Sequence, residues 1–277
     1  MKFDVVIGNP PYQGTQALHQ QFFNKSVDLL SDNGIVAFIQ PATPYFNKKA
    51  KKKKPEQKMI DNINQYHTTV KFVRGNVFDN AAIATDLAIT YLTKTPSTNG
   101  VNVFEYQNGS IYDNVDIADI SLTQMNPEQY KSIRQKFQTF IEINGCLQDQ
   151  LSTDTNVFKA SMSKVRGHAG DNDFFTFIPK SENRHRCKCA DNYTDFGIIA
   201  NDQQEVNNIF DYLESYVARM GLALSKFCIQ QHMGELKTVP LVDFKKTYTD
   251  QELFDQIGLN DNEITAIKSV ISNYYGR

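Results

Sequence analysis

The most constraining feature of this chain is a short apolar segment that runs directly into two consecutive prolines. Residues 3–7 are apolar and mostly β-branched apart from Asp4, and Gly8-Asn9-Pro10-Pro11-Tyr12 follows at once. A run of this kind, bounded by glycine and proline, indicates a buried β-strand that stops at a rigid loop. We therefore expect a side-chain amide, two prolines and an aromatic ring at the end of a strand.

Alternating helix and strand signals continue beyond this loop. The segments that favour each type are residues 17–30 (helix), 35–39 (strand), 56–66 (helix), and 70–73 and 86–92 (strands). Gly34 is the expected stop of the first helix. The alternation is typical of a doubly wound α/β sheet, in which ligands bind at the carboxyl ends of the strands. The Asn9 loop lies at such an end.

The remainder of the chain has a different character. Residues 107–200 are rich in polar side chains and contain a helix signal at 127–143, and residues 201–226 read as one long amphipathic helix. Thr249-Asp250-Gln251-Glu252 has the form of a capping box, with Gly258 as the end of its helix and a last helix from Asn260. We predict three parts: a catalytic α/β part (1–106), a mixed α+β region (107–200) and a helical C-terminal region (201–277).

The residues of the Asn9 loop suit chemistry on an exocyclic amine. The lone pair of such an amine is delocalised into its ring, so an enzyme must hold the amine with acceptors that draw it toward tetrahedral geometry. The Asn9 side-chain oxygen and the Pro10 carbonyl provide two acceptors side by side, since proline has no N–H and a fixed φ. Tyr12 provides a ring on which an extruded base can stack. The alternative is a purely structural turn after a strand.

Asn9-Pro10-Pro11-Tyr12 in this context resembles the catalytic signature of N6-adenine DNA methyltransferases. Residues 34–41, 77–94 and 216–254 resemble later blocks of the large restriction–modification adenine methyltransferases. The resemblance implies a Rossmann-like methyltransferase sheet, with N6 held by Asn9 and the Pro10 carbonyl and the adenine stacked on Tyr12. It also implies that Phe78 contacts the flipped base, although a core phenylalanine is an equal alternative.

The same resemblance implies S-adenosylmethionine as the methyl donor, bound at a Gly-rich turn after a strand. No such turn precedes the Asn9 loop, and neither Gly167 and Gly170 nor Gly221 follows a strand signal. The residues that bind the donor are therefore unknown. We expect a partial sheet whose donor-binding half comes from a second polypeptide; a fragment of a longer chain and a protein without catalysis are the alternatives.

A cluster of lysines is the candidate contact with double-stranded DNA. Seven lysines fall between positions 48 and 58, although the net charge of the chain is −2. One cationic face is enough to bind a phosphate backbone. Lys51, Lys52 and Lys53 are the candidate substrate contacts, with a solvated loop as the alternative.

The sequence gives no strong signal for a metal or a membrane. His185-Arg186-Cys187-Lys188-Cys189 contains ligand types but lacks the usual Cys-x₂-Cys spacing, so we expect no metal. Four cysteines in 277 residues do not indicate a disulfide framework. No apolar run approaches the roughly 20 residues of a membrane span. We expect a cytoplasmic protein with no membrane partner.

Three functional interpretations follow. The first is the catalytic and target-recognition subunit of a site-specific adenine DNA methyltransferase from a restriction–modification system, with residues 107–200 as the target-recognition region. It flips its base and is inactive without a donor-binding partner. The second is a non-catalytic DNA- or protein-binding module derived from a methylase, as a regulator or decoy. The third keeps the enzyme but changes the substrate to protein glutamine or RNA guanine. The long segment after Lys94 favours DNA, because reading base edges requires a separate surface.

Overall fold

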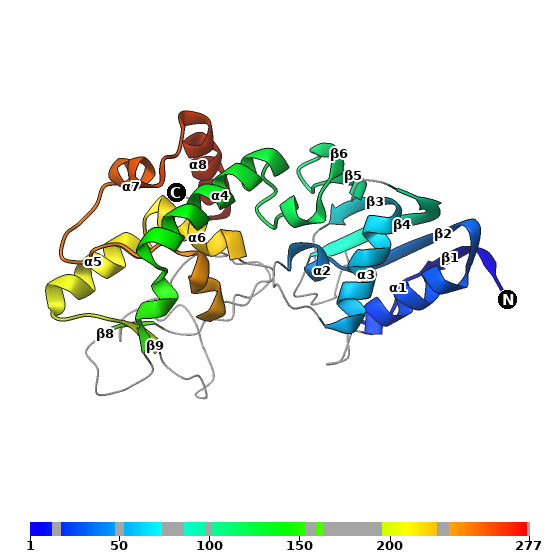
Figure 1. Ribbon diagram of the computed structural model, residues 1–277, viewed down its shortest axis with the longest axis horizontal. Coiled ribbons are helices and arrows are strands. Elements are labelled where there is room, and N and C mark those ends of the chain that lie inside the picture. The colour runs from blue at the N-terminus through cyan, green and yellow to red at the C-terminus, as the bar shows by residue number, and fades with distance from the viewer. Residues whose placement is uncertain are drawn as a thin grey trace. The chain divides into compact units, whose positions relative to one another are not determined.

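The computed structural model divides the chain into two compact units, Met1–Pro127 and Glu128–Arg277 (Figure 1). The structure describes residues 1–12, 18–47, 53–73, 86–97, 101–152, 159–162, 196–225 and 233–275. The boundary expected after residue 106 falls between two paired strands of the first unit. Because residues 163–195 lie outside the described ranges, the three-part division stays a prediction.

The first unit is built on a six-stranded mixed sheet in the order β1-β2-β4-β3-β5-β6. The strands are β1 (Phe3–Gly8), β2 (Leu30–Pro41), β3 (Tyr66–Val73), β4 (Leu87–Pro96), β5 (Val101–Glu105) and β6 (Ile111–Val115). β1 is parallel to β2, and β4 is antiparallel to both β2 and β3. Together with the helices described next, this sheet confirms the predicted α/β class.

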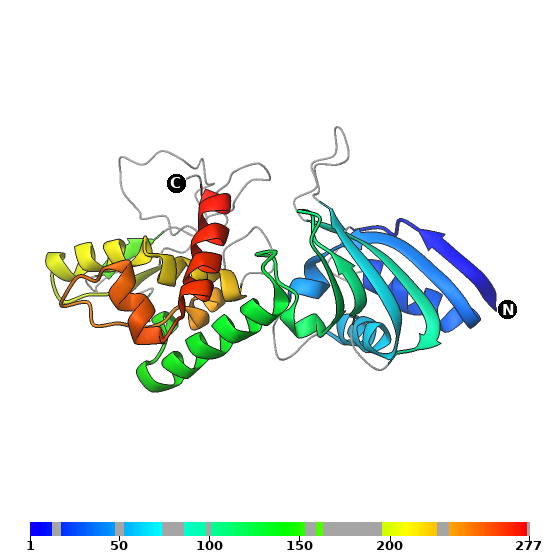
Figure 2. The same cartoon turned by 90° about the horizontal axis from the view of Figure 1, so that it is seen from above.

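Two helices cover one face of this sheet (Figures 1 and 2). They are α1 (Leu18–Leu29) and α3 (Lys54–Gln65), and α1 places Phe23 edge-on against Phe38 of β2 at 6.0 Å between ring centroids. Every second strand residue beneath the helices is buried, as the period of two of a strand requires. These buried positions are Val36, Phe38, Thr68, Val70, Phe72, Ala88, Thr90 and Leu92. Burial of these side chains holds the first unit together.

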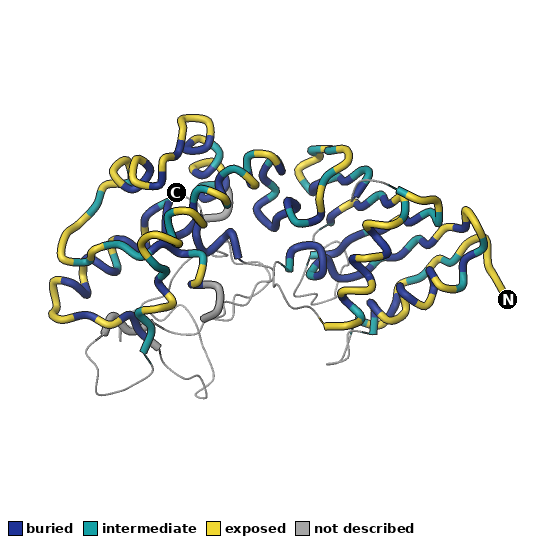
Figure 3. The backbone as a smooth tube through the Cα atoms, in the orientation of Figure 1, coloured by how far each residue is buried: buried dark blue, intermediate teal, exposed yellow. Residues whose placement is uncertain are grey.

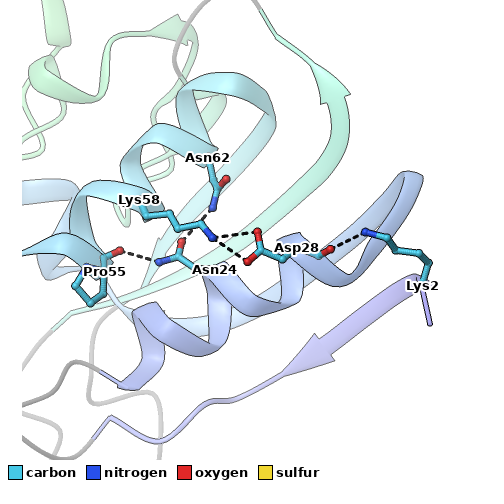
Figure 4. A network of polar contacts seen from close by, with 6 residues as sticks. All are labelled: Lys2, Asn24, Asp28, Pro55, Lys58 and Asn62. Carbon is cyan, nitrogen blue, oxygen red and sulfur yellow. Dashed lines mark hydrogen bonds and ion pairs between the residues drawn. The ribbon is translucent and has the colours of Figure 1, made fainter.

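A polar network joins α1, α3 and the start of β1 (Figure 4). The Asn24 side chain donates to the Pro55 carbonyl at 2.8 Å and accepts from Asn62 at 3.0 Å. Asp28 pairs with Lys58 at 2.8 Å through its carboxylate. Its backbone carbonyl accepts from the Lys2 ammonium at 2.7 Å. These contacts fix the two helices in register with each other.

The opposite face of the sheet is open at β1, which corrects the expectation of a buried first strand. Val5 is 53% exposed, Ile7 77%, Ile35 38% and Tyr91 49%. β1 is the terminal strand of the sheet, and most of its residues are exposed, as the yellow tube near the N-terminus in Figure 3 shows. An apolar sequence shows that a strand suits burial, whereas actual burial depends on whether another element covers it.

Gly34 does not stop α1, as its sequence position had indicated. α1 ends at Leu29 and β2 begins at the next residue, so Gly34 lies within β2. The pairing of β1 with β2 is irregular here, and a Cβ at Gly34 would lie 3.0 Å from the carbonyl oxygens of Phe3 and Ser31. The glycine therefore allows a close approach between two strands.

The second unit combines helices with a small antiparallel sheet. Its helices are α4 (Pro127–Asn144), whose first residue belongs to the first unit, α5 (Gln203–Leu213), α6 (Tyr216–Ser225), α7 (Asp250–Ile257) and α8 (Asp261–Tyr275). Strands β7 (Leu151–Ser152), β8 (Lys159–Met162) and β9 (Phe196–Ile199) form the order β7-β9-β8. The described residues also form short elements. In the first unit these are α2 (Thr43–Phe46) and the 3₁₀ helix η2 (Ile117–Asp119), and in the second unit the 3₁₀ helices η3 (Leu147–Gln150) and η4 (Met233–Thr238).

The single long helix expected over residues 201–226 is two helices, α5 and α6. The Ser215 hydroxyl accepts from the Ala218 amide at 3.1 Å, and Asp250 accepts from the Tyr216 amide at 3.0 Å. These side chains satisfy amide donors at the start of α6, which is how a helix N-terminus is capped. The hydrophobic period continues across the break and therefore does not reveal it.

Candidate functional site

The loops that carry most of the candidate residues leave the sheet at one edge. β1, β2 and β3 point the same way, since β1 is parallel to β2 and β4 is antiparallel to both β2 and β3. The Asn9 loop follows β1, α2 follows β2, and Val73 ends β3. α1 and α3 run back from this edge, because each ends directly before the strand that follows it. The carboxyl edge predicted to bind ligands is therefore where these segments meet.

Within the Asn9 loop, exposed and buried residues alternate. Asn9 and Pro11 are exposed, Pro10 is buried and Tyr12 is half-buried. The Tyr12 hydroxyl donates to the Ile39 carbonyl at 3.1 Å, which ties the far end of the loop to the end of β2. Burial raises the pKa of the Tyr12 phenol, so it remains a neutral donor. The loop is therefore fixed at Gly8 by the strand and at Tyr12 by this bond.

This arrangement leaves the Asn9 side chain free for a ligand. No hydrogen bond joins it to another residue in the described part of the chain. The carboxamide offers one acceptor oxygen and two donor hydrogens. The next peptide carbonyl belongs to Pro10, whose ring fixes φ and whose burial holds the backbone in place. The loop can thus present two acceptors to one amine from a rigid backbone.

A buried polar group that the sequence reasoning did not identify lies at the end of β2. Gln40 is fully buried and donates to the Thr90 hydroxyl at 3.2 Å. That hydroxyl is 2.6 Å from the Tyr45 hydroxyl. The Gln40 side-chain oxygen has no hydrogen-bond partner among the described residues. A glutamine at an inward-facing position of an apolar strand was the available signal, because such residues are rarely buried.

His19 of α1 lies at about the same height along the strand direction as Gln40 of β2. It lies one helical turn before Phe23, and Gln40 lies two strand residues beyond Phe38, the residue that Phe23 contacts. One helical turn and two strand residues advance by similar lengths, about 5 to 7 Å. Both His19 ring nitrogens are buried, and neither has a hydrogen-bond partner in the part of the chain that the structure describes. Burial lowers the His19 pKa to about 4. The imidazole is therefore neutral near pH 7.

Of the candidate DNA contacts, the structure describes Lys53. It is exposed and immediately precedes α3, at the carboxyl edge of the sheet. The Asn47 side chain donates to Glu56 at 2.6 Å, so the end of α2 is held to the start of α3. Lys51 and Lys52 lie outside the described residues, although both neighbouring helices are anchored at the same edge as Asn9.

Several other predicted positions also lie outside the described residues. They are Phe78, the glycine pair Gly167 and Gly170, and the segment 185–189. Among the described residues, no group of three His, Cys, Asp or Glu side chains could hold a metal ion. None of the helices in the described ranges is long and apolar enough to cross a membrane.

The glycines with described surroundings do not form a donor site. Gly8, Gly34 and Gly221 face close neighbours within the protein, the nearest being the Phe38 ring, two backbone carbonyls and the Thr238 carbonyl respectively. Gly109, Gly145 and Gly258 have positive φ, so each serves a turn or a helix end. None follows a strand in a glycine-rich turn. None of these six glycines therefore provides a glycine-rich turn that would hold S-adenosylmethionine.

Comparison with solved structures finds restriction–modification proteins at low similarity. The M protein of the type I restriction enzyme EcoKI has a TM-score of 0.30 and 16% identity, over 38% of this chain and 25% of that chain. A type I restriction–modification complex gives 0.30 and 16%, over 50% of this chain and 30% of that one. The type ISP restriction–modification enzyme LlaBIII, solved bound to DNA, gives 0.24 and 18%, over 41% and 10%. The aligned parts thus span less than a third of these proteins.

Sequence comparison finds a family match to the first part of the chain. No curated protein matches the chain. A family model, Eco57I restriction-modification methylase, matches residues 1–78. This segment holds β1, the Asn9 loop, β2, α3 and β3. The first 78 of the 277 residues, with the candidate loop near their start, are therefore similar to restriction–modification methylases.

Proposed function

We propose that this chain is the catalytic and target-recognition part of a restriction–modification N6-adenine DNA methyltransferase, and that a second polypeptide binds the methyl donor. The observation that carries the proposal is the Asn9 loop at the carboxyl end of β1. In this loop Asn9 is exposed, Pro10 is buried, and the Tyr12 hydroxyl is hydrogen-bonded to β2. The match of residues 1–78 to a restriction–modification methylase family supports the same reaction class.

In this proposal the target adenine leaves the duplex and enters the Asn9 loop. The Asn9 side-chain oxygen and the Pro10 carbonyl accept the two N6 hydrogens, which draws N6 toward tetrahedral geometry and exposes its lone pair. The Tyr12 ring stacks on the base, and its bond to Ile39 keeps the ring from turning away. Preorganised acceptors of this kind act without reorganisation during the reaction.

S-adenosylmethionine supplies the methyl group in this proposal. Because the described glycines do not fit it, we assign its site to the partner and derive no step from this chain's residues. Lys51, Lys52 and Lys53 bind the phosphate backbone near the flipped base, and Phe78 contacts the base itself. Such backbone contacts position the DNA without reading its sequence.

The test separates transfer from binding. Asn9→Ala removes one of the two acceptors, so we expect methyl transfer to adenine to fall about 100-fold or more, in the range measured for single preorganised hydrogen-bonding groups. DNA affinity should change less than about twofold, because the backbone contacts remain. Transfer by the complex with the donor-binding partner is measured as labelled methyl incorporated into duplex DNA, and affinity by fluorescence anisotropy.

Asn64→Ala is the matched control, because Asn64 is an exposed asparagine of α3 outside the loop. Equal loss of transfer and binding in Asn9→Ala would contradict the assigned role. Methylation of protein glutamine or RNA guanine, with none of DNA adenine, would contradict the assigned substrate.

A further inference from the structure

We propose that the open face of the sheet and the free edge of β1 together dock a second polypeptide, which adds a strand parallel to β1 and lays a helix across the face. We call this the β1 surface and define it by Phe3, Val5, Ile7, Ile35 and Tyr91 with the outer backbone edge of β1. The inference rests on the proposed function only in identifying that polypeptide as the donor-binding one.

The β1 surface is continuous and apolar. Val5 pairs with Ile35, and Ile7 pairs with Ala37, which in turn pairs with Tyr91. Phe3 is 40% exposed at the start of the strand. Farther along the same face, the Lys71 ammonium and the Glu105 carboxylate form an ion pair at 2.7 Å, so their charges cancel. A phosphate backbone requires unpaired cations, so this face suits an apolar polypeptide rather than nucleic acid.

The edge of β1 lacks most features that usually protect a terminal strand. Its six residues, Phe-Asp-Val-Val-Ile-Gly, include no proline and no lysine. The one charged side chain, Asp4, accepts from the Ser31 hydroxyl at 2.6 Å and so turns toward β2. Parallel strands are normally covered on both faces, and β1 is parallel to β2. An added strand would satisfy the outer backbone groups by β-augmentation.

The handedness of strand crossovers predicts where the partner's helix lies. α1 connects β1 to β2 and covers one face of the sheet (Figure 2). Crossovers between parallel strands are almost always right-handed. A unit that continues away from β1, in the opposite direction across the sheet, therefore places its helix on the opposite face. A β-α-β unit whose first strand lies beside β1 thus pairs with the free edge and places its helix on the open-face side of the sheet, next to the exposed side chains of β1.

A second copy of this chain does not fit the β1 surface as well. Two copies joined edge to edge through β1 would form one larger sheet and leave both open faces uncovered. Two copies stacked face to face would cover the faces and leave both edges of β1 unpaired. A heterologous strand-and-helix unit covers both features in one interface.

The test uses the full chain co-expressed with each polypeptide encoded beside its gene. Ile7→Lys places a charge at the most exposed apolar position of the β1 surface, and Phe22→Lys is the control at a 51% exposed position of α1. We expect Ile7→Lys to weaken the complex about tenfold or more, because an apolar interface must bury the charge. Phe22→Lys should change affinity less than about twofold. Hydrogen exchange in the β1 peptide should slow in the wild-type complex.

Each other outcome counts against part of the scheme. Equal binding by wild type and Ile7→Lys, unchanged exchange in β1, or no complex with any neighbour would overturn the docking surface. Self-association of the chain that Ile7→Lys abolishes would assign the surface to a second copy. A β1-dependent complex that binds no S-adenosylmethionine would keep the surface and reject the proposed function. If the complex binds S-adenosylmethionine equally well with wild type and with Ile7→Lys, the docking surface would be rejected and the proposed function kept.

Discussion

Tyr12 combines two properties at the scale of a single residue. Its hydroxyl is bound to the Ile39 carbonyl at 3.1 Å, and its ring remains half-exposed. Asn9, three residues earlier, is exposed and has no described hydrogen-bond partner. One side chain is thus held by the protein and the other is available to a ligand. The two positions can be tested separately because their contacts differ.

Two substitutions at Tyr12 separate anchoring from stacking. Tyr12→Phe removes one hydrogen bond worth about 1 kcal/mol, so methyl transfer should fall roughly fivefold. Tyr12→Ala also removes the ring, and loss of base stacking worth about 1–3 kcal/mol should lower transfer further. Transfer to adenine by the complex with its donor-binding partner is the measurement. Equal activity of the two variants would show that the ring does not stack on the base.

His19 predicts a dependence of stability on pH. Its pKa in the folded protein is about 4, because burial disfavours the charged ring, against 6.5 for an unperturbed histidine. Between these values the unfolded chain binds more protons, so folding stability is complete above about pH 6.5 and falls as the pH drops toward 4. After allowance for partial solvent screening, we expect a loss of roughly 2 kcal/mol.

Denaturant unfolding at several pH values, followed by circular dichroism because the chain has no tryptophan, measures this effect. His19→Gln cannot titrate, so its curve should be flatter between pH 6.5 and 4. Parallel curves for the two proteins would rule out His19 as the cause.

At the scale of elements, one buried carboxylate joins two helices of the second unit. Glu263 of α8 accepts from the Ser132 hydroxyl of α4 at 2.6 Å and pairs with the Lys136 ammonium at 2.6 Å. It also accepts from the Asn260 amide at 2.8 Å, which caps α8. Burial raises the Glu263 pKa, but the Lys136 and Ser132 bonds outweigh it and the net shift is downward.

Glu263→Gln should lower the free energy of unfolding by about 2 kcal/mol, because bonds to a charged group are replaced by weaker neutral ones. Asp261→Asn, at an exposed position of the same first turn, is the control. Thermal unfolding above pH 6 is the measurement, since the carboxylate is ionised there. A control that destabilises as much as Glu263→Gln would point to the helix dipole instead of the pairing with α4.

Some elements followed from local sequence, and others depended on distant contacts. Thr249 and Glu252 form the predicted capping box, and Gly258 ends α7 with φ of 74°. Such signals are local, so a few residues specify them. The break at Ser215 depends on Asp250, far along the chain, and was therefore missed. The exposure of β1 and the burial of Gln40 and His19 also depend on tertiary packing.

At the scale of the whole molecule, the candidate loop and the donor site are assigned to different polypeptides. The loop belongs to the first unit, in which the described glycines do not fit the donor. We therefore expect calorimetry to show no binding of S-adenosylmethionine by the purified chain. The complex with its partner should bind the donor with a defined stoichiometry. Tight binding by the chain alone would contradict the division into two polypeptides.

β1 is secured at both of its ends although it has one neighbour in the described sheet. The Lys2 ammonium holds the Asp28 carbonyl at 2.7 Å before the strand, and the Tyr12 hydroxyl holds the Ile39 carbonyl after it. A strand that is held at one end can separate progressively from its neighbour, whereas a strand that is held at both ends keeps its position. A strand that pairs with β1 would consequently find the backbone groups of β1 in fixed positions, so its register could not easily shift by one residue.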